Sequence, residues 1–207
     1  MGVRVGLTGG VASGKSTVSA ILRGLGAVVI DGDVLAREVV ARGTPGLDAV
    51  VAEFGPGLLT PEGDLDRPAM GRLVFGSSDG GAARRRLEAI VHPLVYERIQ
   101  ELEAEAPAGT LVVHDIPLLA ENGREGDFDA VIVVEVPEET QVERMVGQRG
   151  WTEQDARARI AAQATPGQRR AIATYLIDNT GTREDLRDRV TEVFDQLRTA
   201  RRPPSLG

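Results

Sequence analysis

The chain has 207 residues, no cysteine, and 24 basic against 31 acidic side chains, for a formal net charge of −7. This charge argues against a nucleic-acid backbone or an anionic membrane surface as the main partner, so we expect a small molecule or a protein. Disulfides, thiolate nucleophiles and cysteine-based zinc sites are excluded, and two histidines, His92 and His114, are too few for a multi-histidine metal site.

No stretch of the sequence is long and apolar enough to predict a membrane span, since runs such as Ile132–Val134 are far shorter than a bilayer requires. The first residues alternate like a strand (Val3, Val5, Leu7) and lack the apolar segment of a signal peptide. We therefore expect a cytoplasmic protein. The sequence leaves its oligomeric state open.

Short β-branched runs alternate with helical stretches along the chain. The runs predict strands near residues 3–8, 27–30, 110–115, 130–136 and 174–178. After Gly14, apolar residues recur at helical spacing until Gly24 and Gly26 stop the helix. This order predicts an α/β fold with a five-stranded, mainly parallel sheet flanked by helices, whose ligands lie at the carboxyl ends of the strands. We expect one domain over residues 1–200 and a flexible tail over 201–207.

Two long segments are not needed for the sheet. Residues 34–109 are predominantly helical, and residues 140–173 are rich in Arg and Gln, so we expect an acceptor-side cover and a lid. Within the second segment, Thr152–Asp155 predicts a capping box that starts a helix through Gln163, after a hinge at Gly147–Trp151.

The segment Gly9–Thr17 fits the pattern G-x-x-x-x-G-K-[ST], follows a predicted strand and opens a predicted helix. Its inward-facing backbone N–H groups and the helix dipole favour bound phosphates. Lys15, the only lysine in the chain, is expected to reach the β- and γ-phosphates of a bound nucleotide, and the Ser16 hydroxyl to bind Mg²⁺. The predicted nucleotide contacts of this loop are Gly10, Val11, Ala12, Ser13, Gly14, Lys15, Ser16 and Thr17.

The same residues argue against two other classes of nucleotide-binding protein. A guanine-specific GTPase needs a second lysine in its N-K-x-D motif, and none exists. Asp115 is followed by Ile116 rather than by the Glu that activates water in hydrolytic motor ATPases. A transferase to a hydroxyl or phosphate acceptor fits better.

Two carboxylates, Asp31 and Asp33, follow the second predicted strand on either side of Gly32. As an extended i, i+2 pair, both would point into the crevice. Phosphoryl transfer needs positioning, charge neutralisation and a group that accepts one proton from the nucleophile, so Asp33 is the candidate base. The alternative is that one or both cap a helix starting at Val34.

Blocks of residues spread over nearly the whole chain resemble the dephospho-CoA kinase family. They are Gly6–Ser16, Asp31–Asp33, His92–Pro93, Asp115–Glu121, Gln141 with Arg144 and Arg149, Arg159 with Gln163, and Ile177–Gly181. The resemblance implies a P-loop kinase fold with a helical insertion on the CoA side and a lid. It also implies ATP-dependent phosphorylation of the ribose 3′-hydroxyl of dephospho-CoA, the last step of coenzyme A synthesis.

Residues outside the glycine-rich loop are also candidates for nucleotide and metal binding. Asp115 resembles the acid on the Mg²⁺ side, beside Ser16. The guanidinium groups of Arg144 and Arg149 suit phosphate binding, and the alternative is that both belong to a charged helix face. We expect Arg149 to take part in catalysis together with Lys15 and Asp33. Asn179 and Gly181 are expected at the adenine edge, unless their segment is a plain turn.

Three further features have plainer interpretations. His92–Pro93 is expected to end one helix and begin another, or to contact the acceptor. Arg84–Arg86 is expected to be mostly solvated, the alternative being a contact with the phosphates of CoA, and Glu135 is expected to end a strand. Two alternative functions remain open at this point: another small-molecule or nucleotide kinase of the same fold, and a regulatory module that binds ATP as a switch without an acceptor.

Overall fold

The computed structural model describes residues 3–76 and 80–199, without the side chain of Arg149. The chain divides into two compact units. The sheet unit comprises Met1–Ile30 with Glu105–Gly207, and the helical unit comprises Asp31–Ala104. The tail expected over residues 201–207 lies outside the described residues.

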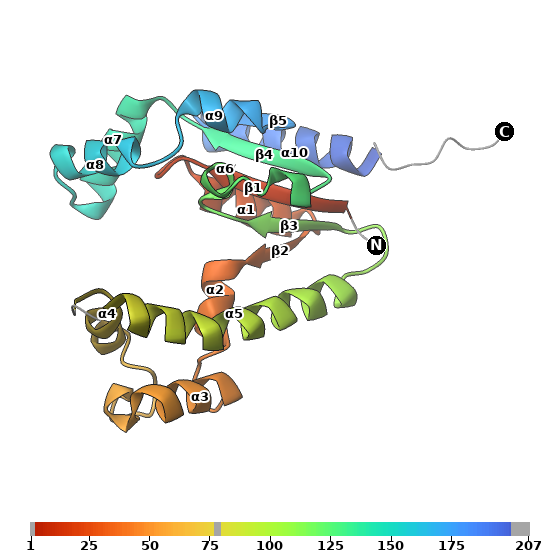
Figure 1. Ribbon diagram of the computed structural model, residues 1–207. Helices are drawn as coiled ribbons and strands as arrows, with labels where there is room; N and C mark the ends of the chain where they lie inside the picture. Colours follow the sequence, from red (N-terminus) through yellow and green to blue (C-terminus); the bar gives the residue numbers. More distant parts are fainter. Residues whose placement is uncertain (1–2, 77–79, 200–207) are drawn as a thin grey trace. The chain divides into compact units, whose positions relative to one another are not determined.

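Five strands form one sheet in the order β2-β3-β1-β4-β5 (Figure 1). They are β1 (Val3–Gly9), β2 (Val28–Asp31), β3 (Leu111–Asp115), β4 (Ala130–Glu135) and β5 (Tyr175–Asp178). The central strand β1 pairs in parallel with both β3 and β4, so that Leu7 lies opposite Asp115 on one side and Ile132 on the other. The carboxyl ends of these strands therefore lie at one edge, as the sequence predicts.

Helices cover both faces of the sheet because the buried strands are apolar on both sides. The helices of the sheet unit are α1 (Lys15–Gly24), α6 (Leu119–Asn122), α7 (Glu138–Arg149), α8 (Glu153–Ala161), α9 (Pro166–Ala171) and α10 (Arg183–Thr199), with a 3₁₀ turn at Glu125–Asp127. Ile132 packs in the cluster with Leu22 of α1 and Phe194 of α10, whereas Val131 and Val133 pack with Leu119 of α6. This alternation along β4 is that of a strand buried between two layers.

The helix predicted after Thr152 begins as predicted and ends earlier. The side chain of Thr152 accepts a hydrogen bond of 3.1 Å from the Asp155 N–H and so caps α8. However, α8 ends at Ala161 and does not reach Gln163. A second helix starts soon afterwards, because Thr165 and Gln168 form a reciprocal capping box with Pro166 in the first turn of α9.

The helical unit contains α2 (Gly32–Glu38), α3 (Pro45–Phe54), a 3₁₀ turn at Pro56–Leu58, α4 (Arg67–Gly76) and α5 (Gly80–Glu105). Its own core is apolar and consists of Val40, Val50, Leu58, Met70, Val74 and Ala83. The predominantly helical character predicted for residues 34–109 is thus confirmed for most of that segment.

The helix break predicted at His92–Pro93 is wrong. Pro93 lies inside the continuous helix α5. A proline in a helix interior removes one backbone hydrogen bond and costs about 3 kcal/mol. Leu87, Ile90 and Val91 pack against the core of the helical unit on the preceding turns, and this burial offsets that cost.

Among the described residues, no helix has the length and apolar character needed to cross a bilayer.

Candidate active site

The glycine-rich loop joins the end of β1 to the start of α1, where the motif requires it. Two residues adopt left-handed backbone conformations, Ala12 with φ 56° and Gly14 with φ 94°. A β-carbon on Gly9 would lie 2.5 Å from the Val134 carbonyl oxygen, and one on Gly14 would overlap the side-chain amide of Asn179. Glycine is therefore needed at position 9 for space and at position 14 for both space and backbone conformation.

Lys15 and Asp115 form an ion pair at the end of β3. The Asp115 side chain is 4% exposed and that of Lys15 is 20% exposed. The second carboxylate oxygen of Asp115 accepts a hydrogen bond of 2.7 Å from the Ser19 hydroxyl of α1. The structure thus brings together Lys15, predicted to bind phosphate, and Asp115, predicted to lie on the Mg²⁺ side. Ser16 is exposed in the first turn of α1.

Side chains from later segments bind the backbone of the loop. Gln141 of α7 donates to the Val11 carbonyl at 2.6 Å, and Gln163 accepts from the Val11 N–H at 2.8 Å. Asn179, just after β5, donates to the Ser13 carbonyl at 2.8 Å. Two of these contacts hold carbonyl groups of the loop, and the third holds an N–H group. A phosphate contact of the Val11 N–H would require its bond to Gln163 to break.

Arg144 of α7 also supports the loop. Its guanidinium donates to the carbonyls of Ala12 and Ser13 at 3.2 and 3.3 Å and to that of Asn179 at 2.9 Å. The interpretation of Arg144 as part of a charged helix face is therefore wrong, because these carbonyl groups turn it inward. Its predicted contact with phosphate stays a prediction.

The remaining nucleotide-side residues lie at the ends of helices. Arg149 is the last residue of α7, and its side chain lies outside the described residues. Gly181 precedes α10, where Asp185 accepts hydrogen bonds from the Thr182 hydroxyl and N–H at 2.7 and 2.8 Å. The hydrogen bond from the Thr182 hydroxyl lowers the pKa of Asp185. Asn179 is buried and tied to the phosphate loop, so this segment does more than close a turn.

The extended pair predicted for Asp31 and Asp33 is wrong. Asp31 ends β2 and accepts hydrogen bonds from the N–H groups of Asp33 and Val34 at 2.9 and 3.2 Å. It is thus the N-cap of α2, which starts at Gly32 rather than at Val34. Asp33 is an exposed residue of the first helical turn. Capping is confirmed for Asp31, whereas the role of Asp33 as a base stays a prediction.

Asp33 lines a cavity of about 640 Å³ within the helical unit. Most of the lining is apolar and includes Val40, Met70, Val74, Val91 and Val95; the polar lining includes Arg67, Arg84, Glu88 and His92. Arg84 donates to Glu88 at 2.8 Å, and this hydrogen bond lowers the pKa of Glu88. The cavity can enclose an apolar chain and offers a carboxylate and an imidazole to polar groups.

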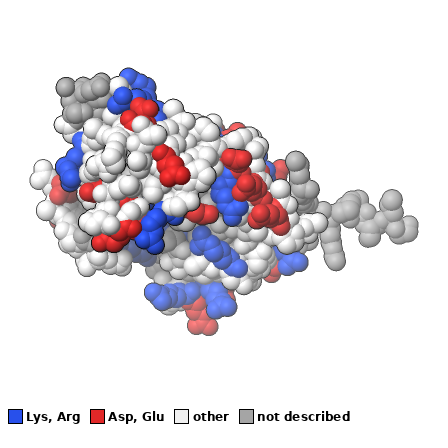
Figure 2. All heavy atoms as spheres, turned by 90° about the horizontal axis from the view of Figure 1, so that it is seen from below, with Lys and Arg blue, Asp and Glu red and all other residues white. Residues whose placement is uncertain are grey.

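The arginine run beside this cavity is a surface feature, as predicted. Arg84, Arg85 and Arg86 are all exposed, and Arg86 lies 3.4 Å from Glu53. On the face presented in Figure 2, basic and acidic side chains are interspersed rather than gathered by sign.

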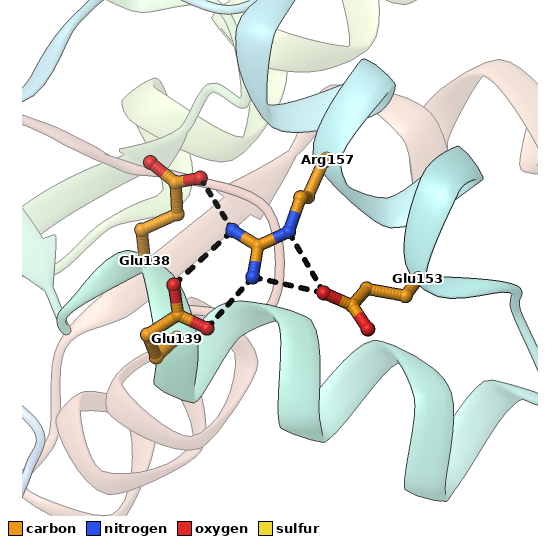
Figure 3. A network of polar contacts seen from close by, with 4 residues as sticks. All are labelled: Glu138, Glu139, Glu153 and Arg157. Atoms are coloured by element: carbon orange, nitrogen blue, oxygen red, sulfur yellow. Dashed lines mark hydrogen bonds and ion pairs between the residues drawn. The ribbon is translucent and has the colours of Figure 1, made fainter.

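A network of ion pairs joins α7 and α8 (Figure 3). Arg157 of α8 lies 3.1 Å from Glu138 and 2.9 Å from Glu139, both in the first turn of α7, and 3.0 Å from Glu153. The hydrogen bond from Arg157 lowers the pKa of Glu139, and the bonds to Glu139 and Glu153 raise the pKa of Arg157. Glu135 ends β4 as predicted and pairs with Arg170 at 2.7 Å.

Comparison with known proteins identifies the family. A model of the dephospho-CoA kinase family matches residues 3–185. This chain belongs to the dephospho-CoA kinase family. The dephospho-CoA kinase of Thermobifida fusca is 55% identical to it over 195 residues, which cover 94% of this chain and 96% of that protein.

Two solved structures share the fold of this chain. The structure of TT1252 from Thermus thermophilus is 34% identical, with a TM-score of 0.74 over 94% of this chain and 96% of that chain. Dephospho-CoA kinase from Campylobacter jejuni, at 24% identity, shares the fold, with a TM-score of 0.66 over 95% of this chain and 97% of that chain. The predicted P-loop kinase fold and phosphotransferase class are confirmed.

Proposed function

We propose that this chain transfers the γ-phosphoryl group of ATP to the ribose 3′-hydroxyl of dephospho-CoA, which yields coenzyme A and ADP. The observation that carries the proposal is a phosphate loop with its single lysine held at the end of β3, in a chain of the dephospho-CoA kinase family. We also propose a cytoplasmic location, where ATP is abundant.

The sheet unit would bind the nucleotide. The carbonyls of Val11, Ala12 and Ser13 are held by side chains outside the loop, an arrangement that favours N–H groups facing a phosphate. Lys15 is the cation for the β- and γ-phosphates, and Arg149 would neutralise charge on the transferred group.

Ser16 and Asp115 would hold Mg²⁺, which neutralises phosphate charge when it is bound. The described residues contain no group of three or more His, Asp or Glu side chains arranged to hold a metal ion. One hydroxyl and one buried carboxylate nevertheless fit this ion, because Mg²⁺ retains several waters and takes further oxygens from phosphates.

The helical unit would bind the acceptor. Its cavity of about 640 Å³ is mostly apolar, which suits the uncharged arm of dephospho-CoA. Asp33 lies on the wall of that cavity and would accept the proton of the attacking hydroxyl. His92 lines the same cavity, which supports the predicted alternative of an acceptor contact.

The product identifies the reaction. Dephospho-CoA is incubated with ATP, Mg²⁺ and the protein, and ³¹P NMR is recorded on the purified product. We expect a new phosphate monoester on the 3′ carbon of the ribose. A monoester at another position, or an unchanged acceptor with ATP hydrolysed to ADP and phosphate, would contradict the proposal.

A further inference from the structure

Arg169 of α9 is a buried cation without an acidic partner. The residue is 6% exposed, and its Nε has no hydrogen-bond partner. Its Nη1 donates to the Ala164 carbonyl, and within the described part of the chain no ion pair forms with it. The adjacent Arg170 differs in exposure and pairing, since its side chain is 62% exposed and pairs with Glu135 at 2.7 Å.

Such a group needs a physical explanation. An ionised side chain is strongly stabilised by water, and its burial is unfavourable unless an opposite charge or several hydrogen bonds replace that water. One carbonyl oxygen does not replace the hydration of a guanidinium with five N–H donors. In folded proteins, strain, a catalytic role, or a water or ion that completes the group accounts for such incompletely satisfied buried groups.

The position of Arg169 indicates which ligand this is. A β-carbon built on Gly10 would lie 3.2 Å from Arg169 Nη2 and 3.4 Å from its Cζ, so the guanidinium adjoins the phosphate loop. Arg169 also lines a cavity of about 760 Å³ with Gln141 and Gln163, the residues whose side chains bind Val11. Lys15, by contrast, is already paired with Asp115.

We propose that Arg169 is a further phosphate-binding residue, whose guanidinium binds a phosphate oxygen of a substrate beside Gly10. The planar guanidinium can give two parallel hydrogen bonds to such a group. The inference rests on the proposed function, because it needs a phosphate-bearing substrate. ATP and dephospho-CoA both carry phosphates, so the test treats them separately.

The test compares Arg169→Met with Arg170→Met, which removes the neighbouring charge from the same helix. The melting temperature is measured without ligand, with ATP and Mg²⁺, and with dephospho-CoA, together with kcat and KM for both substrates. We expect Arg169→Met to keep or raise the melting temperature without ligand, because an unpaired buried charge gives way to an apolar chain of similar length.

Ligand binding and catalysis, by contrast, should be impaired in Arg169→Met. In Arg169→Met the rise in melting temperature on adding ATP should shrink by more than half, and kcat/KM should fall about 100-fold, as expected for a lost hydrogen bond to a charged group. Arg170→Met should keep both within about twofold. If the rise in melting temperature of Arg169→Met is lost with dephospho-CoA and kept with ATP, the proposal is supported, and the phosphate that Arg169 binds belongs to the acceptor.

A lower melting temperature without ligand, combined with wild-type shifts for both substrates, would overturn the proposal and leave Arg169 a structural residue. If Arg169→Met does not fold, Arg169→Lys decides, because it keeps the charge and loses the planar fork. Its kcat/KM should fall about tenfold, and wild-type values would overturn the proposal. Failure of the proposed function would be seen separately: the ligands would raise the melting temperature of the wild type, but the wild type would not phosphorylate dephospho-CoA.

Discussion

Lys15 is the only lysine in the chain, and its ammonium group balances the buried carboxylate of Asp115. Lys15→Ala should therefore have two effects. Turnover should be abolished, because no other cation belongs to the loop. The free energy of unfolding should also fall, by about 3 kcal/mol, because a buried carboxylate loses its partner.

A double variant separates these two effects. In Lys15→Ala with Asp115→Asn the buried charge is gone, so urea denaturation should give a stability closer to that of the wild type, while turnover stays absent. Recovery of turnover in the double variant would refute the role of Lys15 in binding phosphate.

Asp33 and Asp31 are chemically identical and differ in what surrounds them. Asp33→Asn should lower kcat about 100-fold with little change in ATP affinity, because only the proton acceptor is lost. Asp31→Asn is the matched control, since asparagine caps helices as well as aspartate does. Steady-state kinetics with nucleotide titration measures both, and near-normal kcat in Asp33→Asn would remove it as the base.

At the scale of elements, Arg157 connects α7 and α8 through three glutamates (Figure 3). The folded-state pKa of Glu139 is lowered, so this carboxylate stabilises the fold above its unfolded pKa, and the stabilisation is lost as the pH falls through the lowered folded value. The stability difference between the wild type and Arg157→Gln should therefore be largest near neutral pH and vanish in acid.

Urea denaturation at pH 7 and at about pH 3 measures this difference, since an unperturbed glutamate titrates near pH 4.3. Salt at about 1 M should reduce the neutral-pH difference by screening. Arg187→Gln, an exposed position of α10, is the control and should show neither dependence. A difference that persists in acid would mean that Arg157 acts through packing instead of charge.

Elements with a local signal were predictable. The five strands and α1 follow from β-branched runs and helical spacing, and the caps at Asp31 and Thr152 from side chains that accept hydrogen bonds from nearby N–H groups. The continuation of α5 through Pro93 was not, because it depends on a core assembled from distant parts of the helical unit. The end of α8 before Gln163 was not predictable either, because Gln163 binds Val11 of the phosphate loop, 152 residues earlier in the chain.

At the scale of the whole molecule, the account assigns one substrate to each compact unit. Hydrogen exchange measured by mass spectrometry should show ATP slowing exchange in the loop around Gly10–Ser16. Dephospho-CoA should slow exchange in α2, α4 and α5, whose residues line the cavity of the helical unit. Protection of the sheet unit alone by both ligands would contradict the assignment of the acceptor.

The family was predictable because its motifs, Gln141 and Arg144 among them, extend over most of the chain, whereas the contacts of these two residues with the phosphate loop were not predictable. Gln141 and Arg144 contact backbone carbonyls more than 100 residues away, and no sequence pattern encodes such a contact. Arg169 is one of many arginines in the sequence, and only its burial beside Gly10 sets it apart.

The most direct test of the central claim is the rate of ADP release with ATP, Mg²⁺ and dephospho-CoA, measured in parallel with adenosine, with AMP and without acceptor. The account predicts rapid release with dephospho-CoA and only background release in the other three reactions. Release that is equally fast with AMP or adenosine, or independent of any acceptor, would contradict it.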